Sequence, residues 1–82
     1  MVWPFRSPRG KALIRIARLE KRAERAYDAM YDSRRPKDCW DDARAALAEA
    51  IQVATAAGLN DGARRLQGRL EHMRAVYQSQ FR

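Results

Sequence analysis

Cysteine, histidine, glycine and proline are scarce in this 82-residue chain, and each shortage narrows what the protein can be. Cys39 is the single cysteine, so no disulfide can form within one chain, and its free thiol favours a reducing cytoplasm. No apolar run approaches the roughly 18 to 20 residues that a membrane span needs, and the N-terminus lacks the apolar stretch of a secretory signal. The predicted location is therefore the cytoplasm, with peripheral binding to the inner face of a membrane as an alternative.

Groups that carry out catalysis are scarce as well. His72 is the only histidine and stands on a different predicted helix from Cys39, so we expect neither a metal-binding histidine pair nor a nucleophile beside its base. The four glycines stand singly and form no phosphate-binding loop. Asp41 and Asp42 point to different sides of a helix and do not form a catalytic carboxylate pair. The sequence thus predicts a protein that is not an enzyme and that has no metal, no cofactor and no small-molecule substrate.

What the chain has in abundance is alanine, arginine and helical periodicity. Alanine occurs 15 times and arginine outnumbers lysine by 14 to 3, a composition typical of a GC-rich bacterial genome. Apolar side chains recur every three or four residues in three segments, at about residues 11–32, 38–57 and 61–81. Turn-forming residues separate the segments, with Pro36 in the first break and Gly58 as the expected C-cap in the second. The expected N-caps are Asp38 for the second helix and Asn60 or Asp61 for the third.

Short connections between long helices favour antiparallel neighbours. The sequence therefore predicts an all-α fold, an up-down-up antiparallel three-helix bundle formed by residues 11–82, after an irregular basic and aromatic N-terminal arm at residues 1–10. In this topology the end of the first helix, the start of the second and the end of the third share one pole. We expect the aromatic side chains to gather there, with Trp40 close to Tyr77; the expected cluster is Tyr27, Tyr31, Trp40, Tyr77 and Phe81.

Positive charge is concentrated at the start of the chain. Residues 1–25 carry eight basic side chains against two acids, and the other 57 residues carry nine against eight, so the net charge of +7 divides into +6 and +1. Like charges three or four residues apart cost about 0.2 to 0.5 kcal/mol on an isolated helix, and the acids of the other two helices look too few to neutralise these cations. The basic stripe is therefore either a partner-binding surface or arginine cover over apolar surface. It consists of Lys11, Arg15, Arg18, Arg22 and Arg25.

The arm ahead of this stripe combines aromatic rings with cations. Trp3, Phe5, Arg6 and Arg9 have the composition of an interfacial membrane anchor or of a segment that stacks on bases. The alternative is that Trp3 and Phe5 fold back over the alanine-rich pole of the bundle. We take these four residues as candidate partner-binding residues, together with the basic stripe.

Two classes of function remain. The first is a small non-catalytic helical protein-interaction module, an adaptor or regulator, which binds an acidic or amphipathic segment of a partner protein or associates with itself. The second is an electrostatic binder of nucleic acid or of an anionic membrane surface, through the basic stripe and the arm. The absence of a short recognition helix, a zinc finger or evident base-reading side chains favours the first class.

Overall fold

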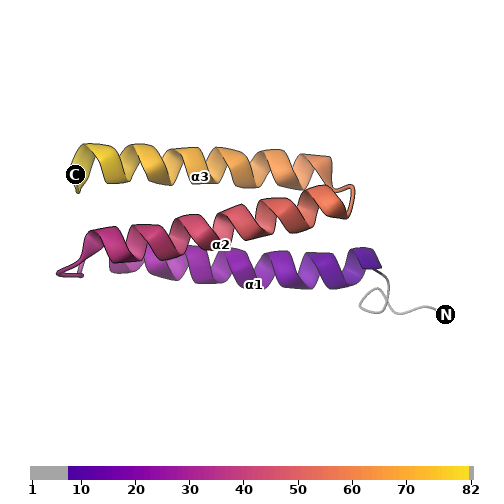
Figure 1. Cartoon of the computed structure of the whole chain (residues 1–82), viewed down its shortest axis with the longest axis horizontal. Coiled ribbons are helices and arrows are strands. Elements are labelled where there is room, and N and C mark those ends of the chain that lie inside the picture. Colours follow the sequence, from indigo (N-terminus) through magenta and orange to yellow (C-terminus); the bar gives the residue numbers. More distant parts are fainter. Residues whose placement is uncertain (1–7, 82) are drawn as a thin grey trace.

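The computed structural model describes residues 8–81, and within this range it is an all-α three-helix bundle without strands. The helices are α1 (Pro8–Ala29), α2 (Pro36–Ala56) and α3 (Asn60–Gln80). Figure 1 shows them side by side, with α1 and α3 running in one direction and α2 in the other. The predicted fold class and up-down-up order are thus confirmed. The molecule is long and thin, with principal extents of 49, 19 and 12 Å.

The first helix begins at Pro8, so the expected boundary between arm and helix at residues 10 and 11 is wrong. Proline suits the first position of a helix because its fixed φ is already helical and its missing N–H has no intrahelical acceptor there. Arg9 is consequently a helical residue. Trp3, Phe5 and Arg6, the other expected arm residues, lie outside the residues that the structure describes. The helix ends at Ala29, and a tighter turn with backbone bonds such as Met30 N to Tyr27 O (3.2 Å) follows it.

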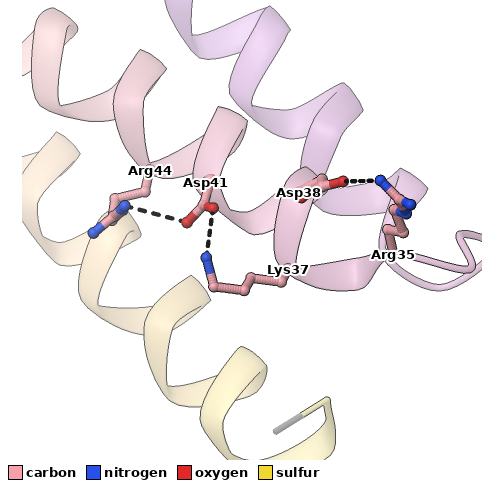
Figure 2. A network of polar contacts seen from close by, with 5 residues as sticks. All are labelled: Arg35, Lys37, Asp38, Asp41 and Arg44. Atoms are coloured by element: carbon pink, nitrogen blue, oxygen red, sulfur yellow. Dashed lines mark hydrogen bonds and ion pairs between the residues drawn. The ribbon is translucent and has the colours of Figure 1, made fainter.

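The second helix also begins at a proline, and the predicted N-cap at Asp38 is wrong. Arg35 occupies the cap position without a side-chain hydrogen bond, and Pro36 starts the helix. Asp38 lies in the first turn, where its charge favours the helix dipole, 3.8 Å from the Arg35 guanidinium. Figure 2 shows this contact beside a second one, in which Asp41 accepts hydrogen bonds from Lys37 (2.9 Å) and from Arg44 (3.2 Å).

Gly58 ends α2 as expected. Its φ is +74°, its N–H donates to Thr55 O, and the Leu59 N–H donates to Ala54 O at 2.8 Å, which together form a Schellman motif. Leu59 is then already the N-cap of α3, since its carbonyl accepts from Ala63 N at 2.9 Å. The expected caps at Asn60 or Asp61 are therefore wrong, because α3 begins earlier than expected and Leu59, which cannot cap through its side chain, takes the cap position.

Alanine determines how closely the helices approach. The buried residues of α2 are mostly alanines, and Ala43, Ala50 and Ala54 have no exposed surface. They allow α2 to pack closely on α1, while the larger Leu66, Leu70 and Met73 of α3 fill the rest of the core. Because α2 contacts both neighbours extensively and α1 and α3 approach each other much less, α2 is the central helix.

The aromatic residues gather at one pole, as the topology predicts. The Trp40 and Tyr77 rings stack with centroids 5.5 Å apart, and Tyr77 stacks on Phe81 at 6.4 Å. Tyr31 meets Phe81 edge to face at 5.1 Å and Tyr27 at 5.9 Å. Side chains just beyond the ends of α1 and α3 therefore touch at this pole, although the two helices approach each other little.

Candidate functional site

All five residues of the basic stripe lie exposed on α1, on the flank that faces α2. The spacing of four, three, four and three residues places them in two parallel lines on the helix surface. Arg15 and Arg22 form the line nearer to α2, and Lys11, Arg18 and Arg25 form the outer line. The two lines differ in what they contact.

The inner line is neutralised by acids of α2. Arg15 binds Glu49 at 2.6 Å, and Arg22 donates from Nη2 (2.7 Å) and Nε (3.2 Å) to one oxygen of Asp42. Seven residues forward on α1 correspond to seven residues back on α2, as antiparallel helices require. Asp42 raises the pKa of the Arg22 guanidinium, chiefly through this hydrogen bond. The expectation that the stripe lacks acidic partners is thus wrong for these two arginines.

The side chains of the outer line are not neutralised by acids of the described structure. Within residues 8–81 the structure gives Lys11, Arg18 and Arg25 no ion pair, and we call these three residues the unpaired row. Their seven-residue spacing puts successive cations roughly 10 Å apart. Arg18 and Arg25 also line a shallow depression together with Lys21, Arg22 and Asp42. In that depression four cations face one carboxylate, which is already bound to Arg22.

The opposite flank of α1 is acidic and faces α3. Arg65 donates two hydrogen bonds to Glu20, at 2.6 and 2.7 Å, and Arg69 forms a similar two-pronged pair with Glu24. Both pairs are 45 residues apart, the constant difference that parallel helices require. The Arg65 hydrogen bonds lower the pKa of Glu20, and the carboxylates raise the pKa of both arginines. The Arg69 guanidinium lies 5.2 Å from the centre of the Tyr27 ring.

Sequence reasoning missed this acidic flank as a partner of α3. The signal was present, since two glutamates four residues apart on the first helix match two arginines four residues apart on the third. Reading it required knowing that these helices run parallel and in which register. Both glutamates of this flank are therefore bound to arginines of α3 within the fold.

Arg9 does not join the basic stripe. It lies in the first turn of α1 and lines another depression, between α1 and the turn from α2 to α3, with Leu13 and Leu59 among the other lining residues. The helical periodicity places Arg9 on the far side of α1 from Lys11. The structure thus places Arg9 apart from the basic stripe, while it brings the five stripe residues onto one flank.

The remaining candidates stay dispersed. Cys39 is half-buried and packs against the core, and His72 is exposed on α3. In the described range no group of three or more histidine, cysteine, aspartate or glutamate side chains could hold a metal ion. Over the same range, none of the helices has the length and apolar character needed to cross a membrane.

Comparisons with known protein families, with curated proteins and with solved structures find no match to this chain. The class to which the protein belongs is therefore given by its own geometry, an all-α bundle of three helices with a charged flank on α1.

Proposed function

We propose that this protein is a non-catalytic helical interaction module of the cytoplasm, an adaptor or regulator, which binds an acidic segment of a partner protein through the unpaired row of α1. The observation that carries the proposal is the division of the basic stripe. The fold neutralises Arg15 and Arg22 and leaves Lys11, Arg18 and Arg25 with like-charged neighbours. Arg18 and Arg25 also lie three and four residues from Lys21, a like-charge spacing that local helix stability disfavours, so a function outside the bundle is the better reason for these cations.

The spacing of the row favours a helical protein segment over nucleic acid. Carboxylates seven residues apart on a partner helix repeat at roughly 10 Å and match the row one to one. Duplex DNA presents a charge about every 1.7 Å of its axis, so three cations over about 21 Å would match few of its phosphates. Self-association through this flank is disfavoured, because a symmetric dimer would place the row against its own copy.

The test compares two triple variants with the same change in net charge. Lys11→Gln, Arg18→Gln and Arg25→Gln remove the row, and Arg34→Gln, Arg64→Gln and Arg74→Gln remove three cations elsewhere that also have no ion pair in the described structure. Each tagged protein is used as bait in nuclease-treated extract of the native host. We expect a partner that the wild type and the control variant retain and that the row variant loses.

Salt and competing ligands give the outcomes that contradict the proposal. Equal loss of the partner in both variants would mean that binding depends on the net charge of the protein, and that the row is not a specific binding site. Tighter binding to duplex DNA or to anionic vesicles than to any protein, with a steep linear fall on a log-log salt plot, would instead establish the polyanion binder.

A further inference from the structure

The basic flank of α1 runs into an apolar depression at one end. Where the start of α1 lies against the end of α2, small side chains leave a shallow, open hollow with Lys11 and Arg15 at its edge. Val53 and Ala57 are half-buried there, and Ala56 is exposed. The apolar lining comes mainly from Ala12, Val53, Ala56 and Ala57.

The other end of the flank is cationic. The second depression, lined by Arg18, Lys21 and Arg25 together with Arg22 and Asp42, lies along the same junction of α1 and α2. From Lys11 at the apolar end to Arg25 at the cationic end the helix rises about 21 Å. A segment of about four helical turns therefore covers both depressions at once.

We propose that the two depressions form one docking track for an acidic amphipathic helix of a partner protein. A large apolar side chain of this helix fills the hollow beside Val53 and Ala56, and its carboxylates, seven residues apart, meet the unpaired row. The inference rests on the proposed function. It adds that the partner segment is an amphipathic helix, and that its apolar end lies at the start of α1. Charge complementarity selects this occupant, because a second copy of the chain would bring cations against cations and a phosphate chain has no group for an apolar hollow.

The test exploits a substitution with opposite effects on the two kinds of binding. Ala56→Arg fills the hollow and adds a cation, so it weakens an occupant anchored by an apolar side chain and strengthens an occupant held by charge alone. Ala56 is exposed and close to the end of α2, where arginine suits both helix propensity and the dipole, so the variant should fold normally. The control is Ala75→Arg, the same change at an exposed position of α3.

The probe is a synthetic, alanine-rich helical peptide of about 20 residues, with two leucines in its first two turns and glutamates at seven-residue intervals. A second peptide has alanine in place of the leucines. We expect Ala56→Arg to lower the affinity for the leucine peptide by about tenfold, which is equivalent to roughly 1.4 kcal/mol from the lost apolar anchor. Ala75→Arg should change the affinity for the same peptide by less than about twofold. The leucine peptide should also bind the wild type more tightly than the alanine peptide.

Each other outcome overturns the inference. If Ala56→Arg binds the leucine peptide as tightly as Ala75→Arg does or more tightly, the flank binds by charge alone, and the proposed function survives without the track. If the row variant binds the peptide as well as the wild type, the proposed function itself fails. If the leucine peptide binds the wild type no more tightly than the alanine peptide does, no apolar side chain is anchored in the hollow and the track fails.

Discussion

The two flanks of α1 carry opposite charge, and the fold uses them differently. The acidic flank gives both of its glutamates to arginines of α3, each in a two-pronged pair. The basic flank gives Arg15 and Arg22 to single carboxylates of α2 and leaves the unpaired row without one in the described range. We call the flank with Glu20 and Glu24 the balanced flank, because both glutamates form ion pairs within the fold. On the basic flank, three of the five stripe cations have no ion pair in the described range.

This difference separates charged side chains that hold two helices together from charged side chains that have no ion pair in the described range. The pairs toward α3 join two helices whose backbones approach little, so they help to hold α3 in register, together with the Tyr27 ring beneath Arg69. The alanines between α1 and α2 already bring those helices together. The cations of the basic flank are therefore less needed for the fold, and substitutions on the two flanks should have different consequences.

The largest effect should come from the ring on the balanced flank. Tyr27 is 9% exposed and contacts both Tyr31 and Arg69, so Tyr27→Ala should lower the free energy of unfolding by about 3 kcal/mol in urea denaturation. Tyr27→Phe keeps the ring and should lower it by less than about 1 kcal/mol. A loss below about 1 kcal/mol in the alanine variant would show that this flank does not hold α3.

Reversing a charge on the balanced flank should have a smaller effect, because the pair is partly exposed to solvent. Glu24→Arg replaces a salt bridge with repulsion against Arg69 and should lower the free energy of unfolding by about 1 kcal/mol. Adding Arg69→Glu exchanges the two charges and should restore most of the loss. The coupling energy from this double-mutant cycle measures the pair, and simple addition of the two single losses would argue against it.

Alkaline pH should weaken the same flank. The hydroxyl contact with Tyr31, together with burial of the ring, raises the pKa of Tyr27 from its ordinary value near 10 to about 12. The fold favours the neutral phenol, so this contribution is complete below pH 10 and disappears as the pH rises toward 12. Thermal unfolding of the wild type should fall across this window more steeply than that of Tyr27→Phe, and parallel curves for the two proteins would contradict the assignment.

The smallest effect on stability should come from the unpaired row. Replacing Lys11, Arg18 and Arg25 by glutamine removes like-charge repulsion and no ion pair, so the free energy of unfolding should stay within about 0.5 kcal/mol of the wild type or rise slightly. The same variant should lose its partner, as proposed above. Markedly earlier unfolding in a thermal melt would show that the row is cover for the bundle and would remove the contrast between the flanks.

Part of this site could be predicted from the sequence because it depends on local periodicity. The basic stripe shares one flank since residues three and four apart lie together on any helix, and the aromatic pole follows from the order of three antiparallel helices. The partners of the stripe could not be predicted. Whether Glu49 reaches Arg15, or Asp42 reaches Arg22, depends on the register and rotation of α2, which single-helix patterns do not contain.

The helix ends show the same limit on a smaller scale. Gly58 could be predicted as a helix end because only glycine adopts a positive φ at low cost. Pro8 and Pro36 could not be predicted as helix starts, because the apolar pattern of each helix begins after the proline. Aspartates near a helix start suggest caps, yet Asp38 and Asp61 lie in first turns. Both helices begin before these aspartates, so the cap positions belong to Arg35 and Leu59, and neither side chain caps its helix.

The amino-acid sequence by itself determined that this chain is helical, that it breaks in two places, and that its positive charge lies on the first helix, because spacing and turn chemistry act between near neighbours. The tertiary structure alone decided which charged side chains form ion pairs between helices. Side chains far apart in sequence meet only because α2 packs on α1 through alanine and α3 packs on α2. That packing divided five similar cations into two that form ion pairs with α2 and three that have no ion pair among the described residues.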